Sequence, residues 1–188
     1  MNLSGSARRG IWRYVPLLAS NAVFLPLLVI LIAFTVRFHH LGTQSLWNDE
    51  GNSLRLAQRS VGDLIDAAGR DIHPPGYYLA LKGWIALAGQ SEFSLRALSA
   101  LAGVLTAAVT VALGRALFSR AAGIMAGLLV ALSPFAVYYS QETRMYAQLA
   151  LLSVLSMWAL VVWIRRIPSP DTGRGEFGTH GCAVATWF

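Results

Sequence analysis

"PPGYYLALKGWIALAG", residues 74–89, decides which topology the rest of the chain can adopt. The segment is apolar, but it opens with two prolines, carries Lys82 at its middle and is shorter than the roughly 20 residues that a spanning helix needs. If it crossed a bilayer, the acidic pair Asp49 and Glu50 and the later "SQETR" segment (140–144) would face opposite sides. If it lies flat in the interface, both polar segments face the same side.

The composition indicates a membrane protein. The chain is 55% hydrophobic and 13% charged, with a mean hydropathy of +0.53, whereas about one quarter of the residues of a soluble domain are charged. The net charge of +6 is carried without a Lys-rich run or interleaved aromatic residues, which excludes nucleic acid as the partner. The single cysteine, Cys182, excludes an internal disulfide.

Long apolar runs predict an all-α fold, an integral membrane bundle of four transmembrane helices. The predicted spans are at about residues 14–36, 97–117, 121–140 and 145–164. The first run is too long for the apolar region of a signal peptide, and no A-x-A cleavage site follows it, so we expect an uncleaved span. "GIMAG", residues 123–127, predicts close helix packing on the third span, and Pro134 predicts a bend near its end.

The distribution of charge favours the arrangement in which residues 74–89 do not cross. With four spans, the whole basic excess of +6 falls on one side, which the positive-inside rule makes cytoplasmic. Residues 1–13 are then a cytoplasmic N-terminus, residues 14–166 form the membrane domain, and residues 37–96 are an outer loop. Residues 167–188, rich in Gly, Pro, Ser and Thr, are expected to be a disordered tail.

The outer loop carries a helical pattern. Its apolar residues recur at helical spacing (Leu54, Ala57, Val61, Leu64, Ile65 and Ala68). Ser60 followed by Asp63 resembles a capping box, which predicts two short helices rather than one. Two-faced helices beside a membrane are expected to lie in the interface. A small soluble loop domain is the alternative.

The acidic pair Asp49 and Glu50 has two interpretations. The acids suit the first turn of a helix that Asn48 or Asp49 caps. Alternatively, a carboxylate at the mouth of a water-poor cleft is a general base for an acceptor hydroxyl, with Trp47 as an apolar wall on which a sugar stacks.

Glu142, Arg144 and His73 have open roles. Residues two apart on a helix do not face each other, so Glu142 and Arg144 are either solvated interface residues or contact different partners. In the second case, Arg144 suits a phosphate, and Glu142 suits an acceptor, a metal or a sugar hydroxyl. His73, held before two prolines, either binds phosphate or metal or ends the loop. Acids together with His could bind a divalent cation, and their spacing does not decide the matter.

Four segments carry a resemblance to a known family: "SLWNDEGNSLRLA" (45–57), "HPPGYYLALKGW" (73–84), "SEFSLRALSALAG" (91–103) and "SPFAVYYSQETRMYAQLALLSVLS" (133–156). Over about residues 10–166, the chain resembles the N-terminal part of bacterial GT-C membrane glycosyltransferases. The nearest branch is that of the dolichyl-phosphate-mannose protein mannosyltransferases and the lipid A aminoarabinose transferase.

The resemblance implies transfer of a sugar from a polyprenyl-phosphate donor to a protein, lipid or glycan, with inversion, on the extracytoplasmic face of a bacterial inner membrane. It implies that Asp49 is the catalytic base, with Glu50 beside it. His73 stands where the aminoarabinose transferase has a Lys that contacts the donor phosphate, and Glu142 matches an acid near the acceptor or metal. Arg144 and Tyr146 belong to the same signature, and Tyr146 joins Trp47 as a substrate wall.

Three further expectations follow. Members of the resembled family continue through more spans, so we expect this chain to be a truncated or frame-shifted product. The alternative function is that of a small non-enzymatic four-span protein that binds polyprenyl lipid or a partner. An ion-coupled transporter is disfavoured, because such proteins carry acids at mid-depth and the apolar runs here contain none.

Overall fold

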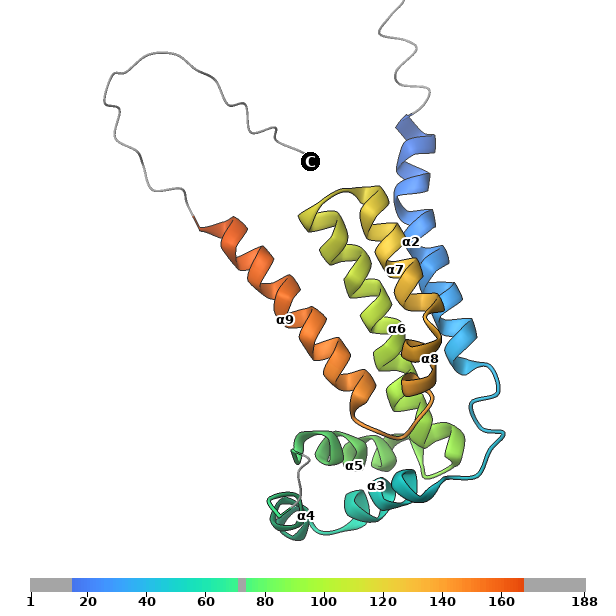
Figure 1. The fold of residues 1–188 in the computed structure, drawn as a ribbon, viewed down its shortest axis with the longest axis vertical. Coiled ribbons are helices and arrows are strands. Elements are labelled where there is room, and N and C mark those ends of the chain that lie inside the picture. The colour runs from blue at the N-terminus through green and yellow to red at the C-terminus, as the bar shows by residue number, and fades with distance from the viewer. Residues whose placement is uncertain (1–14, 71–73, 168–188) are drawn as a thin grey trace, which may run out of the picture.

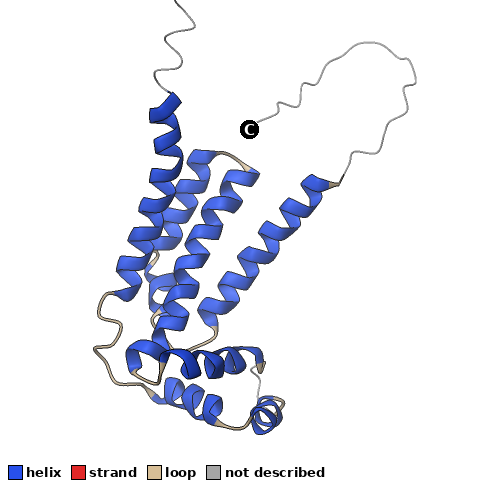
Figure 2. Ribbon diagram, turned by 180° about the vertical axis from the view of Figure 1, so that it is seen from behind, coloured by secondary structure: helices blue, strands red, loops and turns tan. Residues whose placement is uncertain are grey.

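The computed structural model describes residues 15–70 and 74–167, and in residues 15–22 only the backbone. Every regular element in these ranges is a helix (Figure 2), which confirms the all-α prediction. In chain order they are α2 (Val15–Phe38), α3 (Asn48–Gln58), α4 (Val61–Ala68), α5 (Gly76–Ala88), α6 (Glu92–Leu117), α7 (Arg120–Leu132), α8 (Pro134–Ser140) and α9 (Tyr146–Arg166).

The helices form two groups (Figure 1). The long helices α2, α6, α7 and α9 run lengthwise, and α6 contacts each of the other three. Small and β-branched side chains fill the space between α2, α6 and α7, among them Val29, Ala107, Val111 and Ala131. The short helices α3, α4 and α5 lie across one end of the long ones, with α5 next to the start of α9. This group is built from the predicted outer loop.

By length and composition, α6 and α9 are each able to span a membrane, and α7 with α8 is a third candidate that is bent by 59°. The protein is therefore a helical membrane protein. Within the residues whose side chains are described, α2 contributes a shorter apolar helix, Val23–Phe38, so the count of four spans stays a prediction. Helix α6 begins at Glu92, ahead of the predicted span at residues 97–117, and the helix of the third predicted span is interrupted at Ser133.

The interruption at Ser133 confirms the predicted bend at Pro134. Ser133 is the N-cap of α8, and its Oγ accepts a hydrogen bond from the backbone N–H of Ala136 at 3.3 Å. Pro134 fits the first helical position because it has no N–H to donate. After the break, α8 turns toward the crosswise helices, and residues 141–145, which follow it, lie against them.

The glycines of "GIMAG" allow the close packing that the sequence predicts. A Cβ on Gly123 would lie 2.5 Å from the carbonyl oxygen of Val111, and one on Gly127 would lie 2.2 Å from the Val111 side chain. On α6, a Cβ on Gly114 would lie 2.7 Å from the Cα of Gly123. Only glycine fits where α6 and α7 approach this closely.

The crosswise helices follow local signals in the loop. Ser60 caps α4 and accepts from the backbone N–H of Asp63 at 3.2 Å, which confirms two short helices. The predicted apolar face is only partly right, because Leu64 is buried whereas Val61 and Ile65 are exposed. Lys82 of α5 donates from Nζ to the carbonyl of Arg59 at 2.7 Å and so holds α5 against the C-terminal end of α3. That these helices lie in the membrane interface stays a prediction.

Candidate active site

The candidate site is organised around Glu50, in the first turn of α3. Its side chain is fully buried, and both carboxylate oxygens accept hydrogen bonds from Arg96 of α6, at 2.9 Å from Nε and 2.7 Å from Nη2. The backbone N–H of Trp47 donates to Oε2 at 3.3 Å and closes the start of the helix. The N-cap is therefore Trp47, not Asn48 or Asp49. Burial alone raises the pKa of Glu50, but these donors outweigh it and lower that pKa below its ordinary value.

Arg96 fixes the segment that leads from α2 to α3. In addition to its two bonds to Glu50, it donates to three backbone carbonyls: Nη1 to Leu41 at 3.2 Å and Gln44 at 2.8 Å, and Nη2 to Ser45 at 3.2 Å. A guanidinium carries five N–H donors in a fixed plane, and here all five are used. The sequence offers only a weak signal for this role, since Arg96 stands at the edge of an apolar run.

Glu50 also holds the second polar segment, residues 141–145. The backbone N–H of Thr143 donates to Oε1 of Glu50 at 2.8 Å. From α6, Ser99 Oγ donates to the carbonyl of Arg144 at 3.2 Å. The two polar segments that the sequence singled out therefore meet at one end of the long helices, on the same side.

Asp49 and Arg144 face each other at this meeting point. Nη2 of Arg144 lies 3.7 Å from Oδ2 of Asp49. The side chain of Asp49 is 41% exposed, whereas that of Arg144 is 10% exposed. Burial lowers the pKa of Arg144, but Tyr146 and Asp49 outweigh it and raise the pKa. Nε of Arg144 is buried and has no hydrogen-bond partner among the described residues. The partly exposed carboxylate of Asp49 therefore lies beside the guanidinium of Arg144, of which Nε is unpaired among the described residues.

Glu142 is a buried carboxyl with a different environment. Burial raises its pKa, and the nearby carboxylates of Glu50 and Asp49 raise it further, although the Tyr138 hydroxyl and Arg144 act in the opposite direction. The net result is a pKa above the ordinary value. A carboxyl that keeps its proton to higher pH can donate a hydrogen bond to a ligand as well as accept one.

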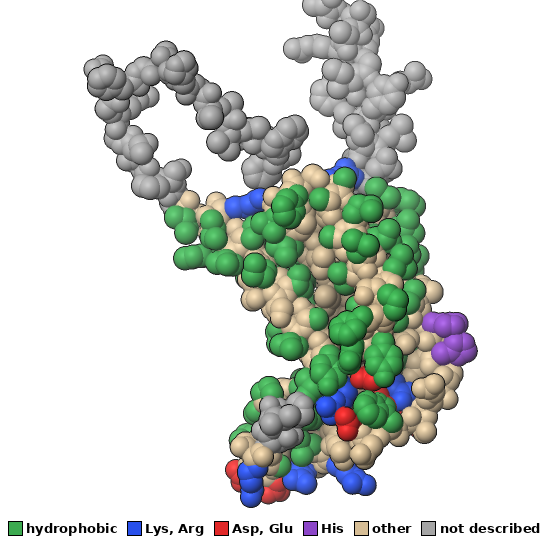
Figure 3. Space-filling model, in the orientation of Figure 1, with side chains coloured by type: hydrophobic (Ala, Val, Ile, Leu, Met, Phe, Trp, Pro, Cys, Tyr) green, Lys and Arg blue, Asp and Glu red, His purple; other side chains and the backbone are tan. Residues whose placement is uncertain are grey.

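A cavity of about 400 Å³ opens beside Glu142. It is lined by Gln44, Ser45, Trp47, Glu50, Arg96, Tyr138, Gln141 and Glu142. Two aromatic rings with amide, hydroxyl and carboxyl groups suit a small polar ligand such as a sugar ring. In the view of Figure 3, acidic and basic side chains meet apolar ones below the long helices.

Comparison with known families decides which class of protein this is. Residues 72–169, just over half of the 188-residue chain, match the model of the dolichyl-phosphate-mannose-protein mannosyltransferase family. The chain belongs to this family. Membership indicates a membrane glycosyltransferase. No curated protein and no solved structure matches the chain.

The family match covers only part of the candidate site. Arg96, Glu142 and Arg144 lie within the matched residues, whereas Asp49 and Glu50 precede them. The contacts of Glu50 with Arg96 and Thr143 therefore link a segment outside the match to the matched helices.

The structure brings most of the predicted site residues together. Trp47, Asp49, Glu50, Glu142 and Arg144 gather around the meeting point, and the guanidinium of Arg144 lies 5.8 Å from the ring centroid of Tyr146. His73 lies outside the described residues.

The segment with Glu142 and Arg144 is a loop that precedes α9. Arg144 faces Asp49, and Glu142 lies near the Tyr138 hydroxyl, whereas contacts of either residue with a phosphate, an acceptor or a metal stay a prediction. Sequence reasoning missed Arg96 and Thr143.

A metal site is not formed by the described residues alone. Within 15–70 and 74–167, no three His, Cys, Asp or Glu side chains lie close enough together to hold a metal ion.

Proposed function

We propose that this protein transfers a sugar from a polyprenyl-phosphate carrier to an acceptor hydroxyl at the meeting point of Asp49 and Arg144. The observation that carries the proposal is the 3.7 Å approach of these two side chains. A base for the acceptor and a cation for the lipid phosphate both have to reach one anomeric carbon, and these two side chains lie at one meeting point from which both could reach it.

The proposed reaction assigns one role to each group. The exposed carboxylate of Asp49 takes the proton of the acceptor hydroxyl, whose oxygen attacks the anomeric carbon. The bond from that carbon to the phosphate oxygen breaks, and the electron pair leaves with the lipid phosphate. Arg144 holds the departing phosphate, because a guanidinium binds phosphate oxygens through paired, charged N–H donors. Glu50 acts as a positioning residue in this scheme, because it is fully buried and accepts from Arg96, Thr143 and Trp47.

The cavity beside Glu142 is the proposed site for a sugar ring. Trp47 supplies an apolar face, and Glu142, with its raised pKa, exchanges hydrogen bonds with sugar hydroxyls. Tyr146 flanks Arg144 as part of the wall. A phosphate contact by His73 stays a prediction. The acceptor is a protein, lipid or glycan hydroxyl.

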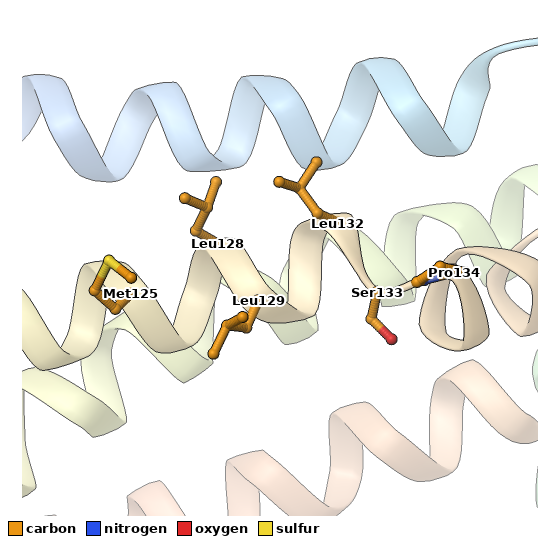
Figure 4. A pocket seen from close by; sticks show the side chains of 6 residues that line it. All are labelled: Met125, Leu128, Leu129, Leu132, Ser133 and Pro134. Carbon is orange, nitrogen blue, oxygen red and sulfur yellow. The ribbon is translucent and has the colours of Figure 1, made fainter.

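A groove on α7 supports lateral entry of the carrier. It has a volume of about 490 Å³ and is lined by Met125, Leu128, Leu129, Leu132, Ser133 and Pro134 (Figure 4). Five of these six lining side chains are apolar, and the groove ends at the break that leads into α8. An isoprenoid chain that lies in this groove would remain within the apolar length of the helices while its phosphate approaches Arg144.

The charges at the two ends support the proposed orientation. Arg115, Arg120, Arg165 and Arg166 stand at the end of the long helices away from Asp49. The described acids all lie on or next to the crosswise helices. By the positive-inside rule, the proposed arginine end is cytoplasmic and the proposed site is extracytoplasmic. The resemblance to bacterial transferases favours a bacterial inner membrane.

Transfer from a labelled donor tests the proposal. The protein in liposomes, supplied with labelled polyprenyl-phosphate sugars, is expected to release label from the carrier. Asp49→Asn is expected to lower the rate by about a hundredfold or more while the donor still binds, because the variant removes the base and keeps the guanidinium of Arg144. Asp66→Asn, on an exposed carboxylate of α4, is the matched control. An unchanged rate in Asp49→Asn would overturn the proposal, and donor binding without any transfer would favour a lipid-binding protein.

A further inference from the structure

Arg37, in the last turn of α2, is a fully buried cation whose described partners are backbone carbonyls. Nη1 donates to the carbonyl of Ala131 at 3.0 Å and to that of Ala33 at 3.3 Å, and Nη2 donates to the carbonyl of Val130 at 3.0 Å. Val130 and Ala131 belong to the last turn of α7, directly before the break at Ser133. The guanidinium therefore joins the ends of two long helices.

The break explains why hydrogen-bond donors are needed at this position. In a continuous helix, the carbonyl of Val130 would accept from the N–H of residue 134, but Pro134 has none. The 59° bend also carries the next backbone donors away from the end of α7. An unpaired carbonyl within the apolar part of a membrane protein is strongly unfavourable. Arg37 supplies the missing donors.

Gln141 makes the reciprocal contact at the other end of α8. Its Nε2 lies within hydrogen-bond distance of three carbonyls at the end of α2: Val36 at 3.3 Å, Arg37 at 3.1 Å and His39 at 3.1 Å. The last turn of α7, just before α8, and Gln141, just after it, are thus both tied to the end of α2. The space around Arg37 is tight, since a Cβ on Gly103 would lie 2.6 Å from its Nε.

We propose that Arg37, together with Gln141, is a positioning residue that sets where α8 ends and therefore where Glu142, Thr143 and Arg144 lie against α3. Residues 141–145 follow α8 directly, and the backbone N–H of Thr143 ties them to the side chain of Glu50 in α3. A shift of α8 would break that bond and separate Arg144 from Asp49. The positioning role of Arg37 does not depend on the proposed function. Only its effect on sugar transfer rests on that proposal.

Hydrogen exchange at the Thr143 amide tests the inference directly. In the protein reconstituted in nanodiscs, Arg37→Met is expected to speed exchange at this amide by about tenfold or more, because the loop opens more often. Arg37→Lys keeps a donor to the carbonyls and is expected to restore part of the protection. Thr35→Val, on the same helix, replaces a hydroxyl that bonds within α2 and should leave the amide unchanged.

Gln141→Met removes the other contact with the end of α2 and does not remove a buried charge. If Arg37→Met does not fold, this variant tests the inference in its place. Gln141 is half-buried, and its loss is expected to speed Thr143 exchange in the same direction. Wild-type protection of Thr143 in folded Arg37→Met or in Gln141→Met would overturn the inference. Asp49→Asn separates it from the proposed function, because this variant should abolish transfer and leave Thr143 protected. Absence of transfer in the wild type and in every variant would contradict the proposed function. The exchange rates at Thr143 would still decide the role of Arg37.

Discussion

Replacing Arg96 with Met is expected to destabilise the protein more than any exposed substitution. The change removes two bonds to Glu50 and three to the carbonyls of the segment 41–45. It also leaves a fully buried carboxylate without its counter-ion. Removal of one partner from a buried pair costs about 3–5 kcal/mol, and the lost carbonyl contacts place this case in the upper half of that range.

Equilibrium unfolding in mixed micelles measures the effect. Arg96→Lys is expected to lose less, because an ammonium keeps the charge but cannot make the two-pronged contact. Arg55→Met, at an exposed position on α3, is the control and should change the free energy of unfolding by about 0.5 kcal/mol or less. In a Glu50→Gln background, Arg96→Met should cost about 1–3 kcal/mol less, because no buried carboxylate remains. A loss below about 1 kcal/mol for Arg96→Met alone would refute this reasoning.

Three further outcomes are expected. Gly123→Ala should destabilise by about 1–3 kcal/mol in the same unfolding assay, because its Cβ would meet α6, whereas Gly83→Ala, with open space around it, should stabilise by about 0.5–1 kcal/mol. Lys82→Met should speed hydrogen exchange in the last turn of α3, since Nζ no longer holds the carbonyls there; unchanged exchange would contradict this. The lowered pKa of Glu50 means that its ionised form stabilises the fold above its ordinary pKa of 4.5 and that this contribution is lost as the pH falls through the lower folded value. Unfolding measured against pH should show this loss in the wild type and not in Glu50→Gln.

The sequence could predict those features that depend on neighbours along the chain. Helical spacing, the cap at Ser60, the glycines of residues 123–127 and the bend at Pro134 each have a local physical cause, and the structure has all of them. The spacing of Glu142 and Arg144 left two interpretations open, and it does not decide between them because the segment is a loop rather than a helix.

The contacts that hold the site together could not be predicted in the same way. Glu50 and Arg96 are 46 residues apart, and nothing in either local sequence specifies the partner of the other. Charged residues at the edge of an apolar run are usually solvated flanks, so the positions of Arg37 and Arg96 gave at most a weak signal of their burial. Their roles arise only from tertiary packing, which brings the ends of α2, α6 and α7 to the two polar segments.

Chemical accessibility tests the central claim, that residues 47–50 and 142–144 share one aqueous face. In a Cys182→Ser background, single cysteines replace Asn48, Tyr138 and Phe118, of which Tyr138 is 60% and Phe118 80% exposed. A membrane-impermeant maleimide applied to intact cells is expected to label positions 48 and 138, and to label position 118 only after the membrane is opened. Labelling of positions 48 and 138 from opposite sides would contradict the account.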